Sequence, residues 1–334
     1  MTFAPRKRLR SLGDWVSRRR RRTRDRNGLV LMYHRIARAP IDPWGLCVWP
    51  EHFEGHVAVL REFADVVPVK DIHVKLRAGP QGKPVVAVTF DDGYADNLYA
   101  AQPVLEYHQV PATVFLATGC LDEPSAYWWD ALATAVLAVG SLPTDLRLES
   151  GTDRFEWWDP AISLRGARGQ RARRALHDRL WNWLSAQPAN QRNEIIEQIR
   201  AWGGAPGQSA ADARPMTRAE VRDLVASGVV DIGGHTRSHP MLSRLSAERK
   251  REEIGACWRD CRHIVGRSPA AFAYPHGDFD QQSIEVVRET GFALACTSQP
   301  SLVWPETNLL TTPRVGVGNW DQHTFRRRLR WWFA

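Results

Sequence analysis

The sequence predicts an α/β protein built on a parallel β-sheet or barrel. Short apolar runs of strand length alternate with helix-like segments along most of the chain, as expected when parallel strands are joined by helices. The runs lie at residues 29–34, 85–90, 112–116, 229–233, 270–274 and 292–297. Polar residues suited to catalysis follow several of these runs, at the strand ends where parallel sheets place their active sites.

The segments between the runs carry recognisable helix ends. Ser, Thr and Asp are favoured at helix N-caps, a Glu three residues later completes a capping box, and Gly commonly ends a helix. The predicted helices begin after Thr217, Ser246 and Asp280 and end near Gly228, Gly266 and Gly291, and Glu220 completes the first capping box.

Strand-like runs are missing between about residues 121 and 215. This region has helical spacing, many arginines and a high density of tryptophan. We interpret it as a helical, Trp-rich insertion beside the barrel mouth, within a single domain that spans residues 28–334. Most of its tryptophans are expected to pack in a helical core. Trp128 and Trp129 lie nearest the barrel in the sequence and are the candidates for substrate contact.

The positive charge of the chain is concentrated at its start. Residues 1–27 hold eleven Arg and Lys against two Asp, so they contribute +9 to the net charge of +8 and leave −1 for the rest. We expect this basic arm to be disordered and to make weak contact with an anionic membrane surface, or to act only as a solubilising tail. Nucleic acid is not expected as a partner. The basic, aromatic stretch 326–333 either assists the arm or forms a terminal amphipathic helix on the barrel.

The composition favours a cytoplasmic location, free or peripheral at the inner membrane face. The sequence shows no signal peptide and no apolar run of about 18 residues that could span a bilayer. Five cysteines at irregular spacing do not predict a disulfide framework. Cys257 and Cys261 lie in a helical pattern and are interpreted as core or surface thiols, not as metal ligands.

Two motifs at strand ends carry the predicted chemistry. Asp91 and Asp92 follow the run 85–90, and His235 and His239 follow the run 229–233. Each motif alone has a structural explanation, because Asp-Asp-Gly is common in turns and two His four residues apart can share one helix face. Together, one Asp and two His provide three ligands for a catalytic metal with open coordination positions, and the second Asp is left to act as a base.

These residues carry a resemblance to a known family. The segments 89–93, Thr-Phe-Asp-Asp-Gly, and 235–239, His-Thr-Arg-Ser-His, resemble the first two motifs of the polysaccharide deacetylases, carbohydrate esterase family 4, known as the NodB-homology domain. The segment 272–277 resembles their third motif, and 31–36 resembles the opening strand of the poly-N-acetylglucosamine deacetylase branch. The resemblance runs from about residue 28 to the end and implies a distorted (β/α)7-type barrel.

The resemblance also implies a metal site and a catalytic base. Asp92, His235 and His239 would hold a divalent ion, with zinc as the first expectation and cobalt, nickel or manganese as alternatives. Asp91 would act as the general base. Ala273 stands where the family usually has an arginine that orients this base. Arg314 is the candidate replacement; its alternative is a surface salt-bridge partner.

Further roles follow from the same resemblance. His34 would be the general acid that protonates the leaving amine, although a lone His after an apolar strand can equally be a buried structural residue. The backbone N–H near His276 would stabilise the oxyanion. Tyr274 belongs to the same motif and is a candidate for substrate contact.

The sequence therefore predicts a metal-dependent hydrolase that removes N-acetyl groups from an N-acetylated sugar or glycan intermediate of polysaccharide biosynthesis. Two alternatives stay open: a metal-independent amidohydrolase of the same fold acting on small amides, and a glycan-binding protein without activity. A nucleic-acid-binding protein is a further interpretation, suggested only by the arginine-rich arm.

Overall fold

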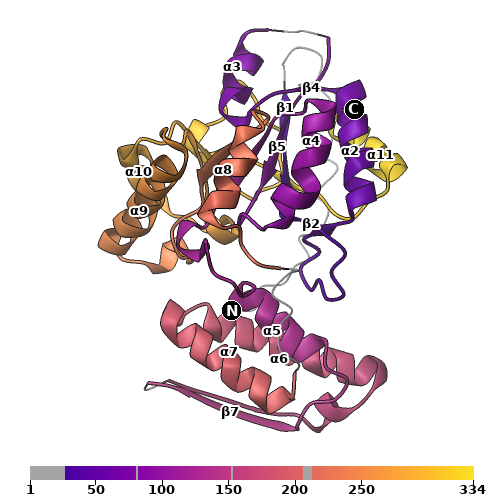
Figure 1. Ribbon diagram of the computed structural model, residues 1–334, viewed down its shortest axis with the longest axis vertical. Helices are drawn as coiled ribbons and strands as arrows, with labels where there is room; N and C mark the ends of the chain where they lie inside the picture. Colours follow the sequence, from indigo (N-terminus) through magenta and orange to yellow (C-terminus); the bar gives the residue numbers. More distant parts are fainter. Residues whose placement is uncertain (1–26, 80–81, 152, 206–212) are drawn as a thin grey trace, which may run out of the picture.

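The computed structural model describes residues 27–79, 82–151, 153–205 and 213–334 (Figure 1). The predicted basic arm therefore lies outside the described residues, apart from Asn27. The main sheet has eight strands that pair in parallel in the order β11-β10-β9-β6-β5-β1-β12, with β4 beside β5. The strands are β1 (Gly28–Tyr33), β4 (Asp65–Val66), β5 (Val85–Phe90), β6 (Ala112–Leu116), β9 (Val230–Gly234), β10 (Ala271–Ala273), β11 (Leu294–Cys296) and β12 (Val315–Gly316).

The sheet curls, and the segment 312–316 joins its two ends. Thr312 forms a parallel bridge with Cys296 in β11, and Val315 pairs with Leu31 in β1. A seven-strand path therefore runs from β11 round to β12 and is linked back to its start. The predicted α/β fold on a curled parallel sheet is confirmed, and all six predicted strand runs match strands within a few residues.

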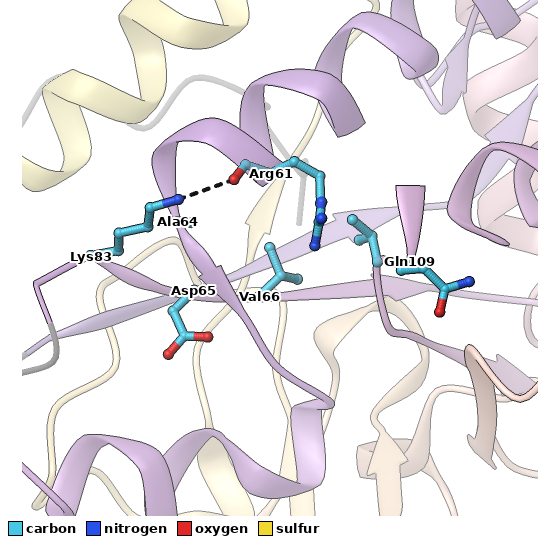
Figure 2. Close-up of a pocket in the computed structure, with 7 residues that line it drawn as sticks. Arg61, Ala64, Asp65, Val66, Lys83 and Gln109 are labelled. Atoms are coloured by element: carbon cyan, nitrogen blue, oxygen red, sulfur yellow. Dashed lines mark hydrogen bonds between the residues drawn. The ribbon is translucent and has the colours of Figure 1, made fainter. Parts of the chain in front are cut away.

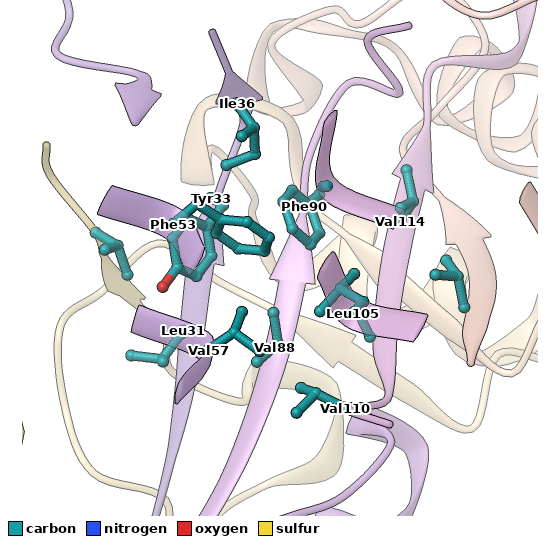
Figure 3. Close-up of a cluster of buried hydrophobic side chains, with 14 of the residues drawn as sticks. Leu31, Tyr33, Ile36, Phe53, Val57, Val88, Phe90, Leu105, Val110 and Val114 are labelled. Atoms are coloured by element: carbon teal, nitrogen blue, oxygen red, sulfur yellow. The ribbon is translucent and has the colours of Figure 1, made fainter. Parts of the chain in front are cut away.

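Helices cover the outer face of the sheet (Figure 1). They are α2 (Pro50–Phe63), α3 (Ile72–Arg77), α4 (Gln102–His108), α8 (Arg218–Ala226), α9 (Ala247–Val265), α10 (Gln281–Thr290) and α11 (Gln322–Phe333). The main core lies between these helices and the strands, where Tyr33, Phe53 and Phe90 pack with ring centroids 5.4 to 5.7 Å apart (Figure 3). Fully burying an aromatic or aliphatic side chain stabilises a fold by about 1.5–3 kcal/mol.

The predicted helix ends are confirmed, and some short elements were missed. α8, α9 and α10 start at the expected caps, and their capping side chains accept backbone hydrogen bonds. The strands β2 (Arg35–Ile36), β3 (Cys47–Val48), β4 and β12 have two residues each, which is too short for a periodic signal. Single-turn 3-10 segments lie at Val69–Asp71, Thr118–Cys120, Pro160–Ser163, Leu242–Arg244, Pro275–Gly277 and Leu309–Thr311, and a π-helical segment lies at Asn97–Ala101.

The Trp-rich region forms a separate layer beside the barrel (Figure 1). It contains α5 (Trp128–Leu137), α6 (Gly166–Leu184) and α7 (Ala189–Gly203), which pack around a core of their own. The insertion is mainly helical, and it also contains a hairpin that the sequence did not indicate, in which β7 (Asp145–Ser150) and β8 (Asp153–Trp158) pair antiparallel. In β7 buried and exposed residues alternate, so only Leu146 and Leu148 face the core. The boundaries of this insertion stay a prediction.

The C-terminal stretch forms the packed amphipathic helix α11. Asp321 caps it by accepting a hydrogen bond from Thr324 N at 2.7 Å, and Phe325 and Leu329 are buried against the barrel. Cys257 and Cys261 are likewise buried, so of the two positions left open by the sequence, core and surface, they occupy the core. Within the described ranges, none of the helices has the length and apolar content required to cross a bilayer.

A cavity of about 330 Å³ lies at the amino ends of β4, β5 and β6 (Figure 2). Arg61, Asp65, Lys83 and Gln109 line it, and Lys83 Nζ donates to the Arg61 carbonyl at 3.2 Å. Lys83 and Gln109 precede β5 and β6, and Asp65 is the first residue of β4, whereas Asp91 and Asp92 follow β5. The cavity is therefore at the opposite end of the sheet from the predicted catalytic residues.

The capping box of α8 gives a test of the fold. Thr217 Oγ1 accepts from Glu220 N at 3.1 Å, and Glu220 Oε2 accepts from Thr217 N at 2.7 Å. We expect Thr217→Ala to lower the free energy of unfolding by about 1 kcal/mol, since an N-cap acceptor is lost. Urea unfolding measures this change. Thr217→Ser keeps the hydroxyl and is the matched control; an equal loss in both variants would contradict the capping role.

Candidate active site

The two predicted motifs meet at the carboxyl ends of β5 and β9, which belong to one sheet. Asp91 continues β5, with its N–H donating to the Tyr33 carbonyl of β1 at 3.0 Å, and His235 continues β9, with its N–H donating to the Leu116 carbonyl of β6 at 2.9 Å. β6 lies between β5 and β9, so the motifs are two strands apart in one sheet although about 140 residues separate them in sequence.

Asp92, His235 and His239 form one compact buried cluster. Asp92 Oδ1 lies 3.5 Å from His235 Nε2 and 3.3 Å from His239 Nε2, and the two Nε2 atoms are 3.2 Å apart. Ligands about 2.0–2.1 Å from a tetrahedral ion are about 3.3 Å from one another. The three donor atoms therefore fit one face of a tetrahedral site and leave its fourth position free of these ligands.

The charge around Asp92 also fits a cation. Burial, followed by the neighbouring carboxylates Asp91 and Asp130, raises the pKa of Asp92 well above its ordinary value. Arg314 lowers this pKa, but its guanidinium forms its ion pair with Asp91. A divalent ion bound at the cluster would supply the missing positive charge and favour the ionised form of Asp92.

A hydrogen bond orients the ring of His235, whereas ring packing orients that of His239. His235 Nδ1 lies 2.7 Å from the Ala273 carbonyl of β10, so this nitrogen carries the proton and leaves Nε2 as the acceptor. The His239 ring packs against Trp129, with centroids 4.9 Å apart. Tyr127 Oη donates to the Asp92 carbonyl at 2.6 Å and holds the backbone of the third ligand.

As predicted, the two histidines lie in a loop and not in a helix. Glu253 of α9 accepts from Arg237 N at 3.0 Å and from Ser238 N at 2.8 Å, which fixes the loop between the ligands. Thr236 and His239 have φ of 63° and 57°, and Asp92 has φ of 72°. Positive φ is unfavourable for residues with a side chain, and such strain is concentrated at functional sites.

Close packing at the end of β9, just before this loop, explains Gly233. A Cβ built on Gly233 would lie 2.6 Å from the Ala271 carbonyl and 2.5 Å from the Phe115 ring. Only glycine fits between β6 and β10 here, and it lies two residues before His235.

Arg314 clamps Asp91 from the far side of the barrel. Nη1 lies 2.6 Å from Asp91 Oδ1, and Nη2 lies 2.7 Å from Oδ2, in a bidentate pair. Both side chains are buried, and Arg314 also donates to the Thr297 carbonyl at 3.0 Å. Burial raises the pKa of Asp91, but the charges of Arg314 and His235 and the Arg314 hydrogen bonds outweigh it and lower the pKa to about 2. The structure thus places Arg314 beside the base and not at the surface.

His34 lies beside the same carboxylate. Its Nε2 is 4.0 Å from Asp91 Oδ2, and its side chain is 17 % exposed, so it borders both the site and solvent. Burial lowers the pKa of His34 to about 4, although the charge of Asp91 raises it. The imidazole is therefore neutral at neutral pH in the free protein.

The third-motif residues are divided between the site and the core. The exposed His276 ring packs edge-on against His239 at 4.4 Å, with φ of 59°. The prediction that Tyr274 contacts substrate is wrong. Its ring is buried between Phe272 and Phe279, and its hydroxyl donates to the Leu310 carbonyl at 3.0 Å.

The candidate substrate-contact tryptophans differ in their exposure to the site. Trp129 is buried and stacks on Tyr127 at 4.4 Å, and its Nε1 donates to Tyr94 Oη at 2.8 Å. Trp128 is half-buried and packs on the insertion core. Trp129 thus supports His239 and adjoins the site through that ring.

Around the candidate site, the structure places further residues that the sequence patterns did not single out. Trp181 of α6 packs on His276 at 5.5 Å and on Trp44 at 5.5 Å, and Trp44 is 43 % exposed. The sequence signal was the high tryptophan content, but it could not separate these rings from core tryptophans. Glu253, whose carboxylate holds the histidine loop, carried no sequence signal.

Comparisons with known proteins agree with this geometry. A sequence model described as "Polysaccharide deacetylase" matches residues 78–140 and 207–295. The Bacillus subtilis (strain 168) protein named "Putative polysaccharide deacetylase YxkH" is 32 % identical over 290 residues, which cover 86 % of this chain and 70 % of that protein.

Two solved structures share the fold. The Streptococcus pyogenes deacetylase PplD, in complex with acetate, has a TM-score of 0.58 at 15 % identity and covers 93 % of this chain and 99 % of its own. IcaB from Ammonifex degensii has a TM-score of 0.58 at 17 % identity and covers 93 % of this chain and 98 % of its own. The chain belongs to the polysaccharide deacetylase family, whose members are hydrolases of amide bonds.

Proposed function

We propose that this protein is a metal-dependent deacetylase that removes N-acetyl groups from an N-acetylated sugar or glycan intermediate of polysaccharide biosynthesis. The observation that carries the proposal is the convergence of three buried ligand atoms beside a separate carboxylate that Arg314 clamps. An amide resists attack by neutral water, so its hydrolysis needs an activated water, a base and an acid, and candidates for all three surround one point.

Asp92, His235 and His239 would hold the ion. Zinc fits three N/O ligands in tetrahedral geometry, and cobalt, nickel and manganese are alternatives for the same mixed site. When bound, the divalent ion lowers the pKa of the attacking water and polarises the amide carbonyl.

Asp91 is the general base. Its low pKa keeps it ionised at neutral pH, and both its oxygens are fixed by Arg314. Each carboxylate oxygen still has a free lone pair that can accept a proton from water. Arg314 therefore lowers the basicity of Asp91 but fixes its position, and positioning is a large part of proton-transfer catalysis.

His34 is the general acid. Because the ring is neutral in the free protein, the proton that it delivers to the leaving amine has to be acquired during the reaction. Asp91, 4.0 Å away, is the nearby group that holds the water's proton after attack. A backbone N–H at His276 is proposed to stabilise the oxyanion, since its ring lies against the metal-facing His239.

The competing functions are less well supported by the same residues. A metal-independent amidohydrolase has no need for three converging ligands, and a glycan-binding protein without activity has no need for an Arg-clamped base.

We also propose a cytoplasmic location and weak contact of residues 1–26 with the inner membrane face. Both proposals depend on charge and composition.

Metal dependence is tested by acetate release from N-acetylhexosamine oligosaccharides. We expect a chelator to abolish release and added Zn²⁺ to restore it. His235→Ala and His239→Ala should lose bound metal, measured by elemental analysis. Asp91→Asn should keep the metal yet lose about 10²–10⁴-fold in kcat, since only proton transfer is removed.

The matched control is Asp71→Asn, an exposed carboxylate that precedes α3 at the amino end of the sheet. It should retain both metal and activity. Chelator-insensitive release, or full activity in Asp91→Asn, would contradict the proposed mechanism.

The Asp91–Arg314 pair predicts a pH dependence of stability. The native pKa of Asp91, about 2, is below the unfolded value of about 3.8–3.9, so its contribution is present above the unfolded pKa and disappears as pH falls through the native pKa. The difference in unfolding free energy between wild type and Asp91→Asn should therefore shrink by about 2 kcal/mol between about pH 5 and pH 2. Denaturant unfolding at each pH measures it. A constant difference would show that the pair does not stabilise the ionised carboxylate.

Removal of residues 1–26 tests the role of the basic arm. Each basic residue near an anionic bilayer contributes about 1 kcal/mol, so truncation should weaken binding to phosphatidylglycerol vesicles at least about tenfold. Acetate release in solution should persist, because the catalytic candidates all follow residue 27. Vesicle co-sedimentation measures binding. Equal binding by both forms, or none by the full-length chain, would exclude this role.

A further inference from the structure

Arg192 of α7 is a buried cation that has no counterion among the residues the structure describes. The residue is 7 % exposed, and its Nε is buried without an acceptor. Across the described ranges, neither a hydrogen bond nor an ion pair joins its guanidinium to another residue. Its guanidinium packs on the Trp128 ring, whose centroid lies 5.3 Å from Arg192 Cζ.

The position of Arg192 links it to the candidate active site. Trp128 packs edge-on against Trp129 at 5.6 Å, and Trp129 packs on the metal-facing His239 at 4.9 Å. Arg192 is therefore connected to the mouth of the site, from the insertion side, through two packed tryptophan rings.

A buried guanidinium normally requires a carboxylate or several acceptors, because removing a charge from water is costly. Glu253 is the nearby acidic group whose charge acts on Arg192, but its oxygens accept hydrogen bonds from Arg237 N, Ser238 N and Ser238 Oγ. The cation–π contact with Trp128 offsets only part of the cost. The remaining donors of Arg192 suit an oxyanion supplied from outside the chain.

We propose that Arg192 binds an oxyanion carried by the substrate, a phosphate or a carboxylate next to the N-acetylated sugar. This inference rests on the proposed deacetylase function and narrows its substrate to anionic sugars. Arg192 lies between the two segments that the family model matches, 78–140 and 207–295, so it is not part of the family motifs. Arginine presents a planar pair of donors that fits either oxyanion, so the two are separated by experiment.

The first test compares substrates that differ in charge. Acetate release is measured with N-acetylglucosamine 1-phosphate, N-acetylmuramic acid and the neutral methyl glycoside of N-acetylglucosamine. We expect wild type to prefer one of the charged sugars, and Arg192→Met to reduce the ratio of kcat/KM for that sugar to kcat/KM for the neutral one by about 10–100-fold. Arg192→Lys should restore part of the ratio. The preferred sugar identifies phosphate or carboxylate.

The matched control is Arg200→Met on the same helix, where Arg200 Nη1 pairs with Glu197 at 2.7 Å. It should leave the charge preference unchanged. An equal ratio in wild type and Arg192→Met, or no charge preference in wild type, overturns the inference while acetate release itself still supports the deacetylase function.

A second measurement does not require turnover. Inorganic phosphate and the two charged sugars are titrated into wild type and Arg192→Met, each with its metal, by calorimetry. We expect the Kd of at least one of these ligands to rise about tenfold or more in the variant. Equal affinities of wild type and Arg192→Met for all three ligands would overturn the inference, whether or not any sugar releases acetate. A failure of every sugar to release acetate would instead count against the proposed function.

Discussion

Two adjacent buried carboxylates set the main constraint on this fold. Asp91 and Asp92 are both 3 % exposed, and placing two ionised groups side by side in a poorly solvated site is costly. Arg314 pairs with Asp91 through both oxygens, whereas Asp92 faces two neutral imidazoles. The two carboxylates therefore have different partners, which agrees with the different tasks proposed for them, Asp91 as a base and Asp92 as a metal ligand.

Closure of the barrel is what delivers Arg314 to the site. Thr312 bridges to β11, Val315 pairs with β1, and Arg314 lies between them with its side chain directed inward to β5. Its bond to the Thr297 carbonyl fixes the guanidinium from the β11 side. The ion pair and the sheet closure therefore depend on each other. This arrangement allows Ala273 to occupy the position where the family usually places its arginine, because the charge arrives from another strand.

The sequence predicted strand ends well and side-chain directions less well. The metal-facing residues follow long apolar runs, so local pattern and chemistry were sufficient to place them together. Tyr274 was misassigned because the alternation of side chains along its strand was not considered. Phe272 and Tyr274 point to the helix-covered face, while Ala271 and Ala273 pack in the interior cluster. That alternation is visible in the sequence, so this error was avoidable. The hairpin β7–β8 was missed because its Leu and aromatic residues were interpreted as part of the helical pattern of the surrounding region.

The burial of Arg192 could not be predicted, because it depends on how the insertion packs. In sequence it is one of many arginines in a helical segment, and such residues are usually solvated. Its burial comes from the packing of the insertion, in which α7 places Arg192 against the Trp128 ring. The barrel provides the chemistry through residues that the family motifs identify, and the insertion contributes rings and one buried charge that those motifs do not include. The burial of an unpaired guanidinium is unfavourable, and the oxyanion of a ligand that pairs with Arg192 would offset this cost.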